Sequence, residues 1–126
     1  MSRTGLAILL WAADPDEPAR LATPFAHAAA AAAMDLQVEV YFSARSVLLL
    51  RPGVAESLRA SARFDKTVAA WMQDALSHGA RFLACSDALA AQGLTPADIL
   101  PAARQHGGAV QFTARAADPA WATLVF

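Results

Sequence analysis

The stretch RFLACSDALAAQGL, residues 81–94, predicts a strand, a turn and a helix in immediate succession. Arg81 to Ala84 is short and largely apolar, which is typical of a buried strand. Ser86 to Gln92 predicts a short helix, which Gly93 would end. Cys85 stands between the two. A strand that passes straight into a helix indicates an α/β fold.

Further strands are predicted on both sides of this stretch. The apolar run Gly5 to Trp11 and the β-branched, aromatic run Gln37 to Phe42 precede it. We expect a fourth strand at Ala109 to Ala114 and a short fifth strand at Ala122 to Phe126. The alternation of strands with helices predicts a mostly parallel five-stranded sheet with helices on both faces.

Three longer segments between the strands predict helices. The first runs through the alanine tract to about Met34, and the second spans Lys66 to His78, where apolar residues recur at helical spacing. The third begins at Thr95, carries an acidic residue in its first turn and runs to Arg104. No repeat or linker divides the chain, so we expect a single domain over residues 1–126.

Charge and cysteine content exclude several functions. The formal net charge is −1 and the basic residues are scattered, which argues against a nucleic-acid partner. One cysteine excludes an internal disulfide and a multi-cysteine zinc site, and it suits a reducing compartment. The three histidines have no metal-ligand spacing, and no phosphate-binding glycine motif is present. We therefore expect no metal and no cofactor.

The amino-terminal segment MSRTGLAILLWAAD has a faint likeness to a signal peptide. It is shorter than the usual length of about 15–30 residues, and Leu6 to Trp11 is equally well explained as a strand. No stretch approaches the roughly 20 apolar residues of a membrane span. The sequence thus predicts a cytoplasmic protein with no membrane partner.

The hydrophobic fraction of 56% is high, although alanine supplies much of it. The bulky apolar residues still exceed what one small core easily buries, and exposed apolar surface marks protein interfaces. We therefore expect a homo-oligomer. The side chains expected at its interface are Trp11, Phe42 and Leu48 to Leu50.

Cys85 is the main candidate for chemistry. In an open α/β sheet, sites form at the carboxyl ends of the strands, and Cys85 would stand there. The free amides at the start of the following helix, from Ser86 and Asp87 onward, favour a thiolate over a thiol. The carboxylate of Asp87 opposes this effect if it lies close. The alternative is that Cys85 is an inert, buried side chain, since free cysteine often packs as a small apolar residue.

The same rule places other polar residues at this edge of the sheet. The first strand leads to Asp14, and the second leads to Ser43 and Arg45. Arg45 and Lys66 are the cations that we consider for stabilising the thiolate, beside the alternative that both are solvated surface charges. We expect Asp14, Ser43 and Arg45 to line the pocket next to the cysteine, beside the alternative that Asp14 only shapes its loop.

The chain resembles the DsrE/DsrF-like family in its order of elements and in two segments, VEVYFSARSVLLLRPG (38–53) and FLACSDALAAQGL (82–94). In that family an apolar strand ends in a cysteine, and a short helix follows that is usually closed by a Gly-Leu pair. Cys85, Gly93 and Leu94 match this pattern, and Val47 with Leu49 and Leu50 matches the pattern after the second strand. The resemblance extends from Leu6 to about Val110.

The resemblance implies a three-layer α/β/α fold with a five-stranded sheet, found in dimers, trimers and hexamers; for this chain we expect a trimer or hexamer. Better understood members of the family carry sulfane sulfur as a persulfide on the matching cysteine and pass it to a partner. Sulfur donor and acceptor proteins are the implied partners. Many relatives have a glycine in the loop after the second strand, where this chain has residues Ser43 to Ser46. The identity of the donor and the acceptor therefore stays open.

Three functional hypotheses follow. The first is a sulfur carrier or sulfurtransferase subunit that holds a persulfide on Cys85 and, with no second cysteine, yields it to an outside acceptor. The second is a non-catalytic binding or assembly module with an inert Cys85 and a small-ligand crevice. The third, a peroxide-reducing enzyme with one cysteine, ranks last because no clear Thr/Arg activating pair is present in the sequence.

Overall fold

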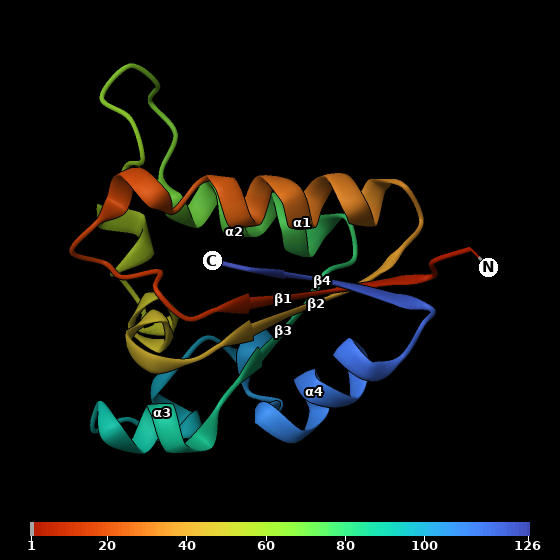
Figure 1. The fold of residues 1–126 in the computed structure, drawn as a ribbon. Coiled ribbons are helices and arrows are strands. Elements are labelled where there is room, and N and C mark those ends of the chain that lie inside the picture. The colour runs from red at the N-terminus through yellow and green to blue at the C-terminus, as the bar shows by residue number, and fades with distance from the viewer. Residues whose placement is uncertain (1) are drawn as a thin grey trace.

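The computed structural model describes residues 2–126, and its centre is a parallel sheet with the strand order β3-β2-β1-β4 (Figure 1). Every pair of neighbouring strands runs parallel. The carboxyl ends of the strands therefore meet at one edge of the sheet. The strands are β1 (Gly5–Leu10), β2 (Gln37–Phe42), β3 (Arg81–Ala84) and β4 (Trp121–Val125).

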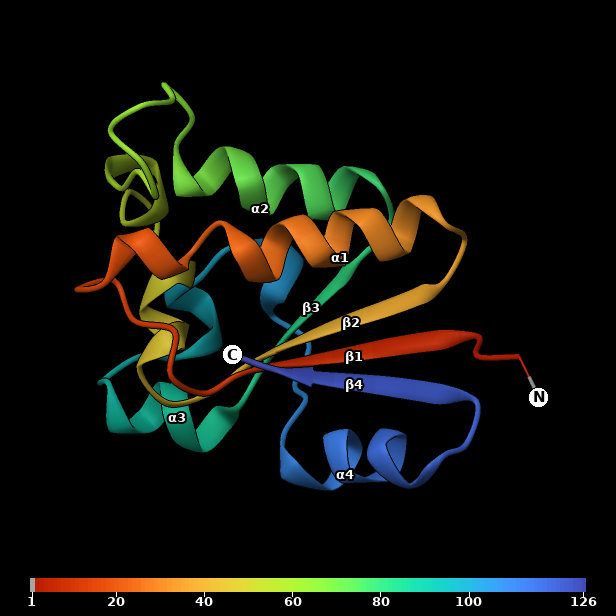
Figure 2. The ribbon, with the colours of Figure 1, turned by 45° about the horizontal axis from the view of Figure 1, so that its top comes forward.

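Helices cover both faces of the sheet, as the alternating sequence predicts. α1 (Thr23–Ala33) and α2 (Val68–Ser77) lie side by side on one face (Figures 1 and 2). α3 (Ser86–Ala91) and α4 (Ala109–Ala117) lie on the other. Within residues 2–126, no helix is both long and apolar enough to cross a membrane.

The larger core lies between the sheet and α1. Because side chains of a strand alternate between its faces, Leu6, Ile8 and Leu10 of β1 share this side. Phe25 of α1 packs against the rings of Phe42 and Phe82, with centroids 6.1 and 5.9 Å away. The buried alanines of α1 let the helix lie close to the sheet.

The core under α4 is smaller. Its buried members are Ala7, Tyr41, Leu83 and Trp121. The Trp121 ring lies over Gly5, where an added Cβ would come within 2.3 Å of the ring. A glycine at the start of β1 therefore makes room for the largest side chain on this face.

The sheet has four strands, so the expected five-stranded sheet is wrong. Ala109 to Ala114, predicted as the fourth strand, is the first part of α4. Val110 and Phe112 alternate with polar residues as they would in a strand, but the alanines that follow favour a helix. Phe112 and Arg115 then fall three residues apart on one helix face, which lies toward the sheet.

The helix predicted from Thr95 to Arg104 is also wrong. Two separate 3-10 turns occupy this segment, Pro96–Asp98 and Pro101–Ala103. Pro101 lacks an amide hydrogen and disfavours the helical conformation at the preceding residue, and Leu100 is accordingly extended with ψ 134°.

Several side chains that we expected at a subunit interface lie in the core. Phe42, Leu49 and Leu50 are fully buried within one chain, so they have no surface left for a partner. Leu48 is half-buried. Trp11 is 66% exposed.

Candidate functional site

Cys85 occupies the turn between β3 and α3. Its amide donates a hydrogen bond of 3.0 Å to the carbonyl of Phe42, which ties the turn to the end of β2. Cys85 is the N-cap residue of α3, but its side chain makes no capping hydrogen bond. Cys85 is half-buried, so it packs partly against the fold and is partly exposed to solvent.

The start of α4 faces the same thiol. The amide of Gly107 donates to the carbonyl of Ala84 (3.2 Å), and the amide of Ala84 donates to the carbonyl of Gln105 (3.1 Å). These bonds hold residues 105–107 against the end of β3. Gly108 is the N-cap of α4, and a Cβ added there would lie 3.9 Å from the Sγ of Cys85. Two helices thus begin beside one sulfur atom.

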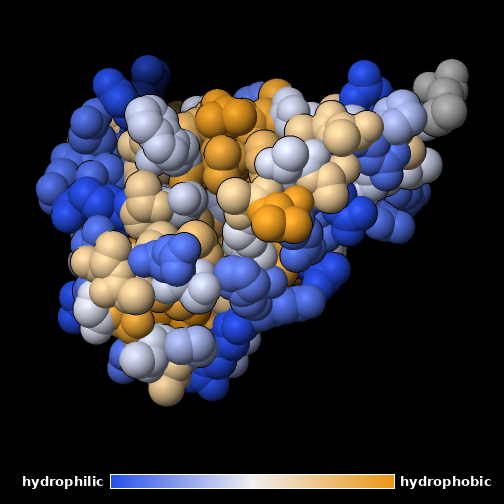
Figure 3. Space-filling view, turned by 60° about the horizontal axis from the view of Figure 1, so that its bottom comes forward, coloured by the Kyte–Doolittle hydropathy of each residue, from blue (hydrophilic) through white to orange (hydrophobic). Residues whose placement is uncertain are grey.

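Two cavities adjoin at Cys85. The first holds about 240 Å³ and the second about 520 Å³, and both are lined by Cys85, Gly108 and Ala109. They lie on the face of α3 and α4, where apolar side chains gather in patches among polar ones (Figure 3). The thiol therefore forms part of a wall common to both. The first cavity is also lined by Leu9, Tyr41, Phe42, Ser43, Gly107, Phe112 and Thr113, and the second by Ser86, Asp87, His106, Val110, Gln111 and Ala114.

The electrostatic setting of Cys85 comes mainly from backbone. The first amides of a helix have no intrahelical acceptor, and no side chain caps the start of α3 or α4. Free amides and the positive end of the helix dipole favour a negative charge. Asp87 also lines the second cavity, and the charge of its carboxylate opposes a second negative charge nearby.

Asp14 and Arg45 form an ion pair of their own at the carboxyl edge. The Nε of Arg45 lies 2.7 Å from the Oδ2 of Asp14, and its Nη2 lies 3.3 Å from the Oδ2 of Asp16. The hydrogen bond from Arg45 lowers the pKa of Asp14, and Asp14 in turn raises the pKa of Arg45. In the described chain, neither Asp14 nor Arg45 is among the residues that line the two cavities at Cys85.

Ser43 does line the first cavity, together with Cys85. Ser43 directly follows β2 and is the N-cap of the 3-10 helix Ala44–Leu50, where Ser43 and Ser46 form a reciprocal capping box. The amide of Ser43 donates to the Oγ of Ser46 (2.9 Å), and that hydroxyl donates to the carbonyl of Leu10 (3.1 Å). The loop that carries Ser43 is thereby fixed to the ends of β1 and β2.

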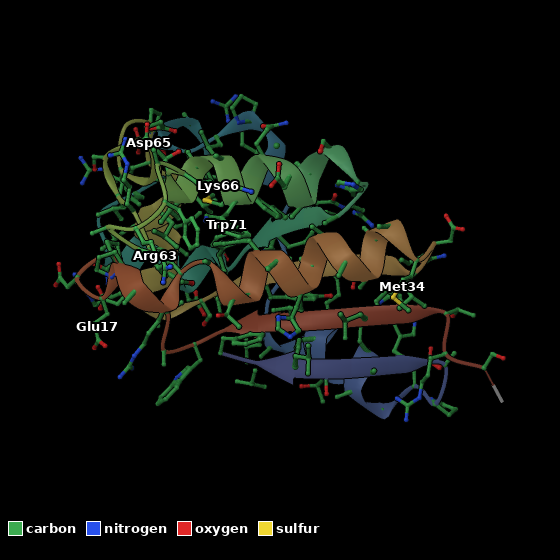
Figure 4. All side chains as sticks on the ribbon, turned by 90° about the horizontal axis from the view of Figure 1, so that it is seen from above. Glu17, Met34, Arg63, Asp65, Lys66 and Trp71 are labelled. Carbon is green, nitrogen blue, oxygen red and sulfur yellow. The ribbon has the colours of Figure 1, made fainter. Side chains whose placement is uncertain are left out.

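Lys66 lies on the opposite face of the sheet, so its expected role beside the thiol is wrong. Its Nζ bonds the Oδ2 of Asp74 at 2.5 Å and lies 3.8 Å from the ring centroid of Trp71. Both partners belong to α2, and the view from that side shows Lys66 beside Trp71 (Figure 4). The sheet separates α2 from α3, which begins at Cys85.

His106 and the Gly107-Gly108 pair line the cavities at Cys85, and the sequence interpretation did not include them in the candidate site. His106 lines the second cavity, and its Cε1 lies 3.5 Å from the position that a Cβ of Gly108 would take. In the sequence these residues lie between a helix predicted to run to Arg104 and a strand predicted to begin at Ala109. The sequence feature that could have indicated them is the glycine pair directly before Ala109. Glycine is typical of places where the backbone approaches another group closely, as it does here at the carboxyl edge of the sheet.

The other two histidines have local partners. The Nδ1 of His27 lies 2.8 Å from the carbonyl of Thr23, and the Nδ1 of His78 lies 2.8 Å from the carbonyl of Asp74. Both bonds stay within a single helix and its cap. Within residues 2–126, no three His, Cys, Asp or Glu side chains gather as a metal site would require.

A family model described as the DsrE/DsrF-like family matches residues 7–126. Comparison with curated proteins finds no match. The matched range contains Cys85, the starts of α3 and α4, and both cavities. It covers nearly the whole chain, and on this evidence the chain belongs to the DsrE/DsrF-like family.

Proposed function

We propose that this protein is a sulfur carrier or sulfurtransferase subunit that holds sulfane sulfur as a persulfide on Cys85. Membership of the DsrE/DsrF-like family points to a role related to sulfur relay. The observation that supports the proposal most directly is the position of the single thiol in the wall common to two cavities. That position offers one reactive atom to a docked partner and a sheltered space beside it.

The proposed chemistry consists of two exchange steps. The thiolate of Cys85 attacks the outer sulfur of a donor persulfide; a new S–S bond forms on Cys85 and the donor leaves as a thiolate. An acceptor thiolate then attacks the outer sulfur of the persulfide on Cys85. A new S–S bond forms on the acceptor, the S–S bond to Cys85 breaks, and Cys85 is left as a thiolate. No net oxidation occurs in either step. Because the chain has one cysteine, the acceptor must come from outside it.

The surroundings of Cys85 suit both steps. The uncapped starts of α3 and α4 favour a thiolate before the first step and a persulfide anion after it. Leu9, Tyr41 and Phe112 make the first cavity largely apolar, and this cavity offers space for the outer sulfur beside Cys85.

The direct test is intact-protein mass spectrometry after incubation with polysulfide or a persulfidated donor protein. We expect the native chain to gain the mass of one sulfur atom and to lose it on addition of a thiol acceptor. Cys85→Ser should keep the fold, since the side chains are nearly isosteric, and gain nothing. Ser77→Ala, at the end of α2, is the control and should load as the native chain does. A native chain that gains no sulfur, or a Cys85→Ser variant that does, contradicts the proposal.

A second candidate function is a non-catalytic binding module, which the largely apolar first cavity of about 240 Å³ favours. Cys85 would then be a packed, inert side chain beside a small-ligand crevice. Thiol labelling of the folded protein separates the two functions. Rapid labelling by a small disulfide reagent supports the carrier, whereas labelling only after denaturation supports the binding module.

A further inference from the structure

α4 is thinly packed for a helix that forms part of the site. None of the residues Ala109 to Ala117 is buried, and Val110 in its first turn is 88% exposed. One aromatic contact attaches its middle to the sheet: the ring of Phe112 meets Tyr41 edge-on, with centroids 5.4 Å apart. A helix in this situation has little apolar burial to fix its position.

The stronger attachment is ionic. Arg115 donates from Nε to Oε1 of Glu39 (2.9 Å) and from Nη2 to Oε2 (3.0 Å), so both carboxylate oxygens are engaged. Glu39 lies in the middle of β2 and is 2% exposed. Tyr41 donates its hydroxyl to the same carboxylate (2.7 Å), and Arg81 of β3 approaches to 3.7 Å. The guanidinium of Arg115 also lies 4.1 Å from the ring centroid of Trp121.

Besides the Phe112 contact, two attachments set the direction of α4. Its start is fixed by the backbone bonds of residues 105–107 to the end of β3. Arg115 lies about 10 Å further along the helix axis and is fixed to Glu39. If the second point is released, the helix can rotate about Gly107 and Gly108, and the direction of its axis relative to Cys85 then changes.

We propose that Arg115 is a positioning residue for Cys85: its ion pair with Glu39, made through both carboxylate oxygens, holds the axis of α4 in the direction that keeps its positive end toward the sulfur. The inference rests on the proposed function, because it assigns a role in preparing the same thiol. Tyr41 connects the two places. Its hydroxyl belongs to the Glu39 network, and its ring lines the first cavity together with Cys85.

The test compares two alkylating reagents of similar reactivity and different charge. Iodoacetate is an anion and iodoacetamide is neutral, so the ratio of their rates at Cys85 reports the local potential. A general loosening of the structure changes both rates together and leaves the ratio unchanged. A swing of the positive end of α4 away from the sulfur lowers the iodoacetate rate selectively.

We expect Arg115→Gln to lower the ratio by about threefold. Arg115→Lys keeps the charge, but an ammonium group cannot bind both carboxylate oxygens in the bidentate geometry of a guanidinium. Its ratio should therefore lie between that of Arg115→Gln and that of the native chain. Arg59→Gln is the matched control, because Arg59 pairs with Asp65 on an exposed loop before α2 and should leave the ratio unchanged. Hydrogen exchange of residues 108–117 should become faster in Arg115→Gln, while α1 keeps its protection.

An Arg115→Gln ratio equal to that of the native chain overturns the inference. If that variant does not fold, the lysine variant alone decides: a native ratio overturns the inference and a lowered one supports it. These measurements use no sulfur donor. A chain that fails to load sulfur but shows the lowered ratio would contradict the proposed function and leave the positioning role of Arg115 standing.

Discussion

Burial raises the pKa of Glu39, but the hydrogen bonds from Arg115 and Tyr41 and the charges of Arg115 and Arg81 lower it by more. The net result is a carboxylate whose pKa in the folded protein lies below the usual value for a glutamate side chain. Burial also raises the pKa of the Tyr41 hydroxyl, and the neighbouring Glu39 raises it further. At neutral pH the pair is therefore an ionised carboxylate that accepts from a neutral phenol.

Because folding lowers the pKa of Glu39, its charge stabilises the fold fully above the pKa of an unfolded glutamate, and this contribution is lost as the pH falls through the lower pKa of the folded protein. We predict that the native chain exceeds Glu39→Gln in free energy of unfolding by about 2 kcal/mol at neutral pH, because the substitution removes the buried charge that Arg115 pairs with. The difference stays moderate because the Arg115 end of the ion pair is partly solvated. The margin should shrink at about pH 3. Urea unfolding at the two pH values measures it, and a margin that is unchanged at low pH contradicts the prediction.

Gly107 and Gly108 are adjacent but differ in what a methyl group would meet. A Cβ on Gly107 would lie 2.7 Å from the Cβ of Leu83 and 3.1 Å from Cε2 of Tyr41, both of which are rigidly held. A Cβ on Gly108 would meet nothing closer than 3.5 Å. We predict that Gly107→Ala costs about 1–3 kcal/mol and that Gly108→Ala is nearly neutral. Thermal unfolding of the two variants checks this, and equal losses would contradict it.

At the scale of elements, strands with an unambiguous pattern were predictable. The predicted bounds of β2 and β3 match the structure, and β1 differs by one residue at its end, because buried parallel strands have continuous apolar or β-branched runs. The short helix after Cys85 was also predictable, because Gly93, which has a positive φ, follows its end. The residues that predict each of these elements lie within the element itself or directly beside it in the sequence.

α4 was not predictable in the same way. The sequence around Val110 and Phe112 satisfies both a strand and a helix pattern over a few residues, and the choice depends on contacts remote in sequence. The Arg115 partner, Glu39, lies on another element altogether. The part of the site formed by His106, Gly107 and Gly108 was missed with α4, whereas Cys85, Ser86 and Asp87 followed directly from the β3–α3 turn.

At the scale of the whole molecule, large apolar side chains remain exposed near the ends of β1 and β4. Trp11 is 66% exposed, Val125 60% and Leu124 36%. β4 is an edge strand, so its outer backbone groups have no neighbouring strand in the described chain. Exposed apolar surface beside a free edge is typical of an interface.

We predict that the protein forms a homo-oligomer, a trimer or a hexamer, through a surface that includes Trp11. Light scattering at micromolar concentration should return several times the mass of one chain, and Trp11→Ser should lower that value because it removes apolar area without touching the core. Met34→Ser, at an exposed side chain just after α1, is the control and should assemble normally. The mass of one chain for the native protein would rule the prediction out.

The wall common to the two cavities contains a single sulfur atom, and this limits the cargo to one unit per chain under the proposed function. Donor and acceptor must each touch that atom, so they visit in alternation and never form a ternary complex with it. Steady-state kinetics of sulfur transfer should then follow a double-displacement scheme. The kcat/KM measured for the donor would stay the same at every acceptor concentration, because the donor always meets an emptied carrier.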